Sequence, residues 1–228
     1  TFASILMPGV QHMRHTHLPE HKFVSGQPET GGDLADDLER IASNFGPENI
    51  AACIVEPIAG STGTLVPPKG YLQRLREICD KHGILLIFDE VITGWGRTGS
   101  AFASHEFGVT PDLMTMAKAT TNGVVPMGVV ACKDEIYDAV MDASPMGSVE
   151  LFHGYTYSGI PVAVAAGLAV QDIFEKEDIF NRAKNLAPYF QKGLFSLQDL
   201  ESVENIRGYG MMGGIDMKMN TKPGKAGY

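Results

Sequence analysis

Glu56, Asp89 and Lys118 each stand directly after a short apolar run of the sequence. Such runs are typical of strands buried in a parallel sheet, and in open α/β proteins the carboxyl ends of these strands border the ligand crevice. A single ionisable residue at a strand end is most often a side chain that reaches solvent. Three of them at corresponding positions favour a shared site, because a charge near the core is costly unless it is paired or used.

Asp89 and Lys118 together match the requirements of one cofactor. They are 29 residues apart, which fits two strands joined by a crossover. Pyridoxal 5'-phosphate (PLP) requires a lysine amine for its aldehyde and a carboxylate that keeps its pyridine nitrogen protonated. The lysine then serves as a general base after the substrate amine displaces it. This pair is therefore our candidate for the catalytic centre of a PLP enzyme.

Three other kinds of site have weaker support. The run before Asp89 also fits the acidic strand of a P-loop ATPase, and on this run alone both interpretations stay open, but the G-x-x-x-x-G-K-[ST] string of that class does not occur in the sequence. The glycines of residues 94–99 match G-x-G-x-x-G, yet no helical pattern begins there, so we expect no dinucleotide site. Four histidines lie between residues 12 and 21, but Pro19 interrupts any helix and no cysteine joins them, so we expect no metal site.

Alternating strands and helices must position the candidate residues. Apolar periodicity predicts helices over residues 33–44, 71–82, 134–141, 161–175 and 179–197. Strand-like runs occupy residues 50–55, 84–88, 111–117, 125–132 and 210–216. This alternation indicates an α/β fold whose mostly parallel sheet is flanked by helices. We expect residues 1–175 to form a cofactor-binding large domain and residues 176–228 to begin a smaller second domain.

The bulk properties exclude several classes of protein. The 228 residues carry a formal net charge of −9, which disfavours binding to nucleic acids and to anionic membranes. No apolar stretch approaches the roughly 20 residues of a membrane span, and no signal peptide is apparent. The three cysteines show no metal spacing, so we expect buried thiols in a cytoplasmic protein. The chain begins without Met and ends in a loop-like segment, so we expect a piece of a longer protein.

Three segments of the sequence resemble the signatures of class III (omega-type) aminotransferases. They are Phe88–Gly99 (FDEVITGWGRTG), Pro111–Gly128 and His153–Gly159 (HGYTYSG), and they occur in the order and spacing of that family across nearly the whole chain. Within the family, the loops Gly9–His17 and Gly60–Leu72 resemble the omega-amino acid–pyruvate branch, which includes beta-alanine–pyruvate aminotransferases.

The resemblance implies the type I PLP-dependent transferase fold, with a large α/β domain and the start of a small C-terminal α+β domain. It implies a transaminase that moves an amino group from an omega-amino acid or amine to pyruvate or a similar keto acid, in a homodimer or dimer of dimers with shared active sites. Sister activities stay open: 4-aminobutyrate, ornithine or diamine aminotransferase, or glutamate-1-semialdehyde aminomutase. An inactive homologue is also open, although the intact Asp89 and Lys118 argue against it.

The resemblance also implies roles for individual residues. Lys118 would hold PLP as a Schiff base and shuttle the proton, and Asp89 would bind the pyridinium nitrogen. Thr156 would bind the cofactor phosphate of the neighbouring subunit, and Arg97 would hold the turn after the strand. Four further residues would lie close to the cofactor: Val91, Ile92, Tyr155 and Glu56.

The sequence departs from the family pattern at three places. Trp95 stands where Phe is usual, and Ile160 stands where His normally precedes Pro161. Ala119 and Thr120 replace a commoner Gly-Leu or Ala-Leu pair. We expect these changes to alter packing near the site rather than the contacts to PLP.

Overall fold

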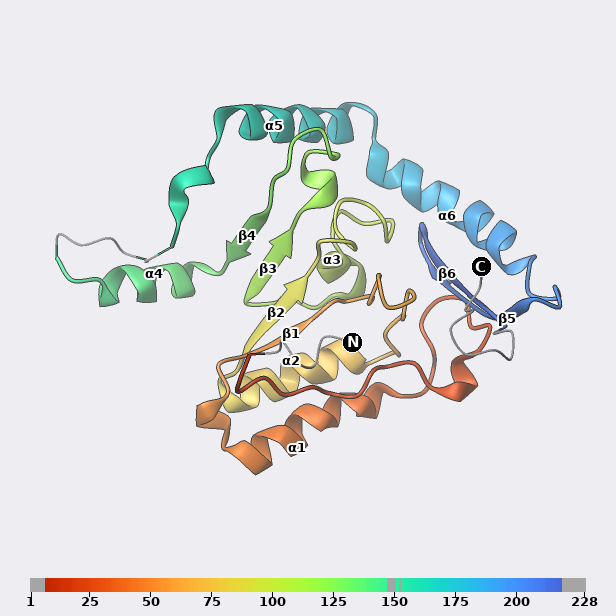
Figure 1. Cartoon of the computed structure of the whole chain (residues 1–228), viewed down its shortest axis with the longest axis horizontal. Helices are drawn as coiled ribbons and strands as arrows, with labels where there is room; N and C mark the ends of the chain where they lie inside the picture. The colour runs from red at the N-terminus through yellow and green to blue at the C-terminus, as the bar shows by residue number, and fades with distance from the viewer. Residues whose placement is uncertain (1–6, 147–150, 152, 219–228) are drawn as a thin grey trace.

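The structure is a computed structural model that describes residues 7–146, 151 and 153–218 (Figure 1). Its main sheet has four strands in the order β1-β2-β3-β4. β1, β2 and β3 run parallel, and β4 is antiparallel to β3, which confirms the mostly parallel sheet. The strands are β1 (Ala52–Val55), β2 (Leu85–Asp89), β3 (Leu113–Met116) and β4 (Val129–Cys132).

All five predicted helices are present in the structure, together with one short helix that the sequence pattern does not indicate. The short helix is α3. The helices are α1 (Asp36–Phe45), α2 (Tyr71–His82), α3 (Ala103–Phe107), α4 (Asp134–Ala143), α5 (Pro161–Lys176) and α6 (Ile179–Phe195). No helix in the described part of the chain is both long and apolar enough to cross a bilayer.

The core that supports β2 is supplied largely by α2. Leu72, Leu75 and Ile78 recur on one face of this helix and are at most 1% exposed. They belong to the same core cluster as Phe88 of β2. Full burial of each such side chain contributes about 1.5–3 kcal/mol. The helix ends at Gly83, which adopts a left-handed φ of 67° that glycine tolerates without strain. This packing fixes the strand whose last residue is the candidate aspartate.

β4 is shorter than the predicted strand over residues 125–132. β3 pairs with it only as far as Met116, and the chain then turns at Lys118, where φ is 49°. In the described part of the chain, residues 125–128 therefore have no neighbouring strand to pair with. Cys132 is exposed, contrary to the expectation of three buried thiols, because β4 lies at the edge of the described sheet.

A separate antiparallel hairpin contains β5 (Val203–Tyr209) and β6 (Met212–Met217). The sequence pattern predicts only the second of these strands. β5 carries Arg207, which is 5% exposed and forms a bidentate ion pair with Asp216 of β6. Arg207 Nε also donates a hydrogen bond to the Gly63 carbonyl at 2.8 Å. The hydrogen-bond donors of Arg207 are thus paired with groups from other parts of the fold, which the local sequence does not reveal.

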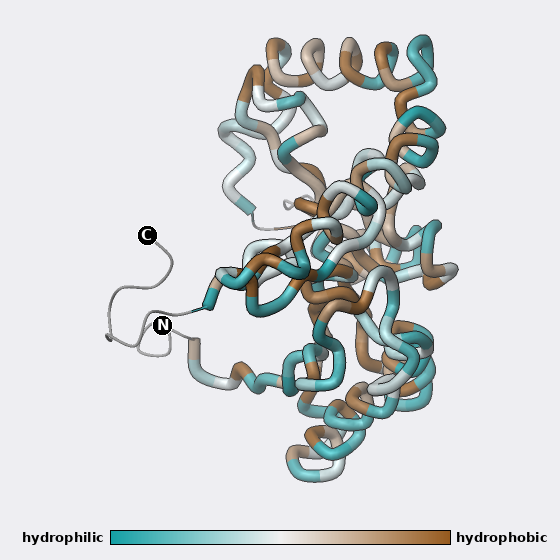
Figure 2. The backbone as a smooth tube through the Cα atoms, turned by 90° about the vertical axis from the view of Figure 1, so that its right-hand side faces the viewer, coloured by the Kyte–Doolittle hydropathy of each residue, from teal (hydrophilic) through white to brown (hydrophobic). Residues whose placement is uncertain are grey.

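Burial is uneven between the two halves of the chain. In Figure 1, α1 and α2 lie on one side of the main sheet, and α5 crosses near its opposite end. Among the described residues, α4 and α6 have none that are buried, and α5 has Ala163 and Gly167. Figure 2 shows brown, apolar stretches of the backbone near the centre of the molecule. The predicted domain boundary falls where α5 gives way to α6, and the division itself stays a prediction.

Candidate active site

The parallel pairing of β2 and β3 brings Asp89 and Lys118 to the same edge of the sheet. Asp89 is the last residue of β2 and is paired with Thr115 of β3. β3 ends at Met116, and the 3-10 turn η5 (Lys118–Thr120) begins two residues later. Both side chains therefore lie at the carboxyl ends of neighbouring strands, where ligands bind in open α/β sheets.

The carboxylate of Asp89 is half-buried and held through one of its oxygens. Oδ1 accepts hydrogen bonds from the Val91 backbone N–H at 3.0 Å and from the Thr115 hydroxyl at 3.2 Å. Oδ2 accepts no hydrogen bond from the residues that the structure describes. The side chain is thus oriented by two donors and still has one oxygen free to accept a proton or a hydrogen bond from a ligand.

Lys118 is exposed and has an unusual backbone conformation. Its φ of 49° lies in the left-handed region, which costs a residue with a Cβ roughly 1–3 kcal/mol. Its carbonyl accepts the Gly123 N–H at 3.2 Å, which closes the turn. In the described part of the chain, its Nζ makes no hydrogen bond or ion pair. Backbone strain of this kind is concentrated at functional sites. Here the strained residue is the one whose side-chain amine has no partner among the described residues.

Glu90 anchors the loop that follows Asp89, a role that the sequence pattern does not indicate. The side chain is fully buried. Its Oε2 accepts hydrogen bonds from the Thr93 hydroxyl at 3.0 Å and the Ala103 N–H at 2.7 Å, and its Oε1 accepts the Ser104 N–H at 2.8 Å. The only signal in the sequence is an acidic residue placed directly before a glycine-rich loop. Its partners 13 and 14 residues away depend on how that loop folds.

Val91 and Ile92 lie in this loop and are both half-buried. Val91 contributes its N–H to Asp89, whereas the Ile92 side chain packs against the main core. It also approaches Gly60 so closely that a Cβ there would lie 2.7 Å from Ile92 Cδ1. Arg97 Nη1 donates to the Ile92 carbonyl at 2.6 Å and thereby holds the turn, as expected. The placement of Val91 and Ile92 beside a cofactor ring stays a prediction.

Glu56 stands at the same edge of the sheet, on the far side of β2 from Lys118. Val55 is paired with Phe88, so Glu56 follows β1 at the level of Asp89. Its Oε2 accepts the Gly60 N–H at 2.9 Å. The carboxyl ends of all three parallel strands therefore carry an ionisable side chain, as the spacing predicts.

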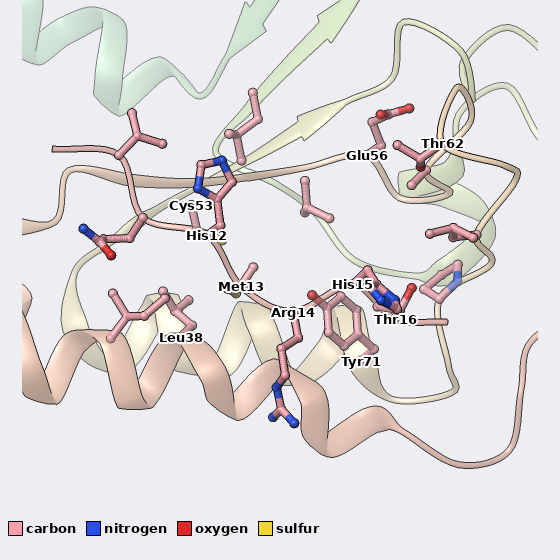
Figure 3. A pocket seen from close by; sticks show the side chains of 18 of the residues that line it. His12, Met13, Arg14, His15, Thr16, Leu38, Cys53, Glu56, Thr62 and Tyr71 are labelled. Atoms are coloured by element: carbon pink, nitrogen blue, oxygen red, sulfur yellow. The ribbon is translucent and has the colours of Figure 1, made fainter. Parts of the chain in front are cut away.

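A cavity of about 1190 Å³ lies beside β1 (Figure 3). The loop from His12 to Thr16 runs between β1 and α1, which carries Leu38. Of the seven candidate site residues, Glu56 alone lines this cavity. Histidines of the same loop line it too, but the described residues contain no cluster of three side chains placed to hold a metal ion. Asp89 and Lys118 do not line this cavity.

Tyr155 and Thr156 are not joined to the centre by any contact within the described chain. They form the 3-10 turn η6 (Tyr155–Tyr157), are exposed, and lie on the far side of β4, ahead of α5 (Figure 1). The Tyr155 ring meets His153 with centroids 4.9 Å apart. The expected role of Thr156 toward a neighbouring subunit remains a prediction.

The family model for class-III aminotransferases matches residues 3–226. The chain belongs to this family. Among its curated relatives, the omega-aminotransferase of Caulobacter vibrioides is 56% identical over 214 residues, which cover 93% of this chain and 48% of that protein. The beta-alanine–pyruvate aminotransferase of Pseudomonas aeruginosa is 53% identical over 210 residues, with coverages of 91% and 47%. The chain spans about half the length of these relatives.

Solved aminotransferase structures share the fold. A thermostable omega transaminase mutant from Pseudomonas jessenii is 33% identical to this chain with a TM-score of 0.84, and the match covers 94% of this chain and 48% of that one. An omega-transaminase from Thermomicrobium roseum is 41% identical with a TM-score of 0.77, with coverages of 82% and 41%. The α/β fold expected of a PLP-dependent transaminase is thereby confirmed.

The residues at the carboxyl edge of this class-III family chain fit PLP. The ring nitrogen of PLP requires a carboxylate oxygen that is not already engaged, and Asp89 Oδ2 is such an atom among the described residues. The aldehyde requires an amine that is not held in an ion pair, and Lys118 Nζ meets this condition. Both groups come from adjacent strand ends of one sheet.

Proposed function

We propose that this chain carries the central part of the PLP site of an aminotransferase, which moves the amino group of an omega-amino acid or amine to pyruvate or a similar keto acid. The observation that carries the proposal is a pair of groups at one sheet edge, the Lys118 amine and Asp89 Oδ2. Neither has a hydrogen-bond partner among the described residues, and Asp89 is paired in register with Thr115. The similarity to aminotransferases across nearly the whole chain supports it.

Each residue has a defined task in this reaction. When bound, PLP supplies an electron sink for the negative charge that develops on the substrate carbon. Asp89 Oδ2 holds a proton on the ring nitrogen, and Thr115 and the Val91 N–H keep the carboxylate in place. Lys118 Nζ would bind the cofactor aldehyde and, when free, would move the proton from the amine-bearing carbon of the substrate to the carbon of the former cofactor aldehyde.

The order of similarity among relatives supports the omega-amino acid–pyruvate branch. The omega- and beta-alanine–pyruvate enzymes are 56% and 53% identical to this chain. A putrescine–pyruvate aminotransferase is 40% identical, and a tomato gamma aminobutyrate transaminase is 36% identical. We also propose a cytoplasmic homodimer or dimer of dimers in which Thr156 binds the cofactor phosphate of the neighbouring subunit and Tyr155 lies beside it. Glu56, Val91 and Ile92 then lie near the cofactor of their own subunit.

The test uses the intact protein purified with PLP. We expect alanine to form from pyruvate when beta-alanine is the donor, and more slowly when putrescine or 4-aminobutyrate is the donor. Borohydride reduction should attach the cofactor irreversibly to the peptide that contains Lys118, as mass spectrometry would show. Faster turnover with putrescine or 4-aminobutyrate would show that the protein has a sister activity instead. Absence of alanine from every donor would identify an inactive homologue.

A further inference from the structure

A chain of two hydrogen bonds links the loop after Asp89 to the turn that contains Lys118. The Trp95 indole N–H donates to the Thr120 hydroxyl at 3.0 Å. That hydroxyl donates in turn to the Ala117 carbonyl at 3.1 Å. Because this carbonyl belongs to the peptide bond that joins Ala117 to Lys118, the chain of bonds ends at the backbone of the lysine itself.

The donor side chain of this link is held between aromatic rings. Trp95 stacks on Phe174 of α5, with centroids 5.7 Å apart and planes inclined by 25°. Phe102 meets it edge-on at 5.0 Å. An indole that is packed on two sides has one orientation for its N–H, so the bond to Thr120 is directed rather than incidental.

The backbone of Trp95 is confined as well. Its φ is 64°, and its N–H donates to the Ala101 carbonyl at 2.6 Å. The glycines on either side permit close contacts. A Cβ at Gly94 would lie 2.8 Å from the carbonyl oxygen of residue 90, and one at Gly96 would lie 2.9 Å from the ring of residue 180. The loop therefore presents the indole from a fixed position.

The acceptor end of the link coincides with the strained residue. Thr120 is 3% exposed. Its backbone N–H and its hydroxyl both donate to the Ala117 carbonyl, at 3.1 Å each. Lys118, the next residue, has a φ of 49°. A left-handed conformation with a Cβ persists only where its surroundings hold it, and these bonds are the polar contacts that act on the peptide ahead of it.

We infer that Trp95 and Thr120 are positioning residues that set the direction of the Lys118 amine relative to Asp89. The inference rests on the proposed function. The bond from Thr115 to Asp89 joins β3 to β2. The Trp95–Thr120 bond joins the loops that follow these two strands.

The experiment is a double-mutant cycle in the intact PLP-loaded enzyme. Trp95→Phe keeps an aromatic ring and removes the N–H, and Thr120→Val keeps the shape and removes the hydroxyl. Each single variant should lower kcat roughly two- to tenfold with little change in KM, as expected for the loss of one hydrogen bond in Trp95→Phe and two in Thr120→Val. Each should also shift the pH midpoint of the visible absorbance of the bound cofactor. The double variant should be no worse than Thr120→Val alone, because that variant already removes the bond that Trp95→Phe removes.

Two controls separate positioning from packing. Thr120→Ser retains the hydroxyl and should restore the wild-type pH midpoint. Ile78→Val, in the core face of α2 and away from the link, removes buried volume only, so it should lower Tm and leave the midpoint unchanged. The same cycle on urea midpoints of the cofactor-free protein gives a second readout. If Thr120→Val does not fold, Trp95→Phe, which keeps an aromatic ring beside Phe102 and Phe174, carries the test.

The outcomes distinguish this inference from the proposed function. Additive effects in the cycle, or unshifted midpoints in both single variants, would overturn the positioning role while Lys118 still binds PLP in the wild type. A wild-type protein that shows no borohydride-fixed cofactor on Lys118 would overturn the proposed function, and the inference with it.

Discussion

Two aspartates at opposite ends of the same pair of strands have opposite environments. Asp112 precedes β3, and both of its oxygens are engaged. Oδ2 accepts hydrogen bonds from Arg76 Nη1 at 2.8 Å and from the Leu86 N–H at 2.7 Å, and Oδ1 lies 2.7 Å from Lys133 Nζ. Asp89 ends β2, and within the described chain only its Oδ1 is engaged.

The difference separates a structural carboxylate from one that is available for chemistry. Burial by itself would raise the pKa of Asp112, but the hydrogen bonds from Lys133, from the Leu86 N–H and from Arg76 outweigh it, so the pKa lies below its usual range. That group is already satisfied and can only stabilise the fold. Asp89, at the edge where ligands bind, keeps an oxygen unused.

The largest expected effect comes from removing the amine at the carboxyl edge. Lys118→Ala should lower kcat by at least about 10³-fold, because the covalent attachment and the proton transfer are both lost. Steady-state assay of alanine formation measures this. Lys176→Ala, at an exposed lysine of α5, is the matched control and should leave kcat unchanged. Near wild-type turnover in Lys118→Ala would contradict the assignment of Lys118 as the cofactor-binding residue.

Asp89→Asn tests the catalytic half of the comparison. The amide keeps the shape and can still accept from Val91 and Thr115, but it cannot hold a proton on a ring nitrogen. We expect kcat to fall by about 10², which corresponds to about 2.7 kcal/mol of barrier. The urea midpoint of the cofactor-free protein should change little. An unchanged kcat would contradict the assignment of Asp89.

Asp112→Asn tests the structural half. It leaves Arg76 and Lys133 without their shared anion at a site where the aspartate side chain is 8% exposed. We expect the free energy of unfolding to fall by about 2–3 kcal/mol, with kcat of the folded enzyme within twofold of wild type. Denaturation curves and assays on the same preparation measure both. A loss of kcat without a loss of stability would reverse the comparison.

Thr115→Val tests how strongly the held oxygen of Asp89 matters. The change removes the hydroxyl that donates to Oδ1 and keeps the β-branched shape that suits a strand. We expect kcat to fall roughly two- to tenfold, as for one hydrogen bond. Thr115→Ser should recover most of the loss. If Thr115→Val equals wild type, the Val91 N–H alone is sufficient to orient the carboxylate.

The smallest effect is a pH dependence of stability. Since the pKa of Asp112 is lower in the folded chain than the roughly 3.9 of an unfolded aspartate, its contribution is present above about pH 4 and is lost as pH falls through the folded-state pKa. The difference in unfolding free energy between wild type and Asp112→Asn should therefore shrink on acidification below about pH 4. Urea titrations at several pH values measure this. A difference that grows on acidification would contradict the sign.

Some elements were determined by the sequence alone, because their signals are local. The apolar runs that become β1, β2 and β3 predict strands, and the helical register of Leu72, Leu75 and Cys79 predicts a helix over about residues 71–82, which α2 occupies. The ionisable residues that follow those runs therefore had to meet at one sheet edge once the strands paired in parallel. Asp89 and Lys118 could therefore be predicted as neighbours from the sequence.

Other features were decided only by the tertiary structure. Glu90 finds its donors at Ala103 and Ser104 after a loop has folded back, and Trp95 reaches Thr120 across 25 residues. The polar strand β5 is likewise stabilised by an ion pair and by a carbonyl from another part of the chain. A side-chain hydrogen bond has no periodicity along the sequence. It forms where packing brings a donor and an acceptor within about 3 Å, and that distance is set by the whole fold.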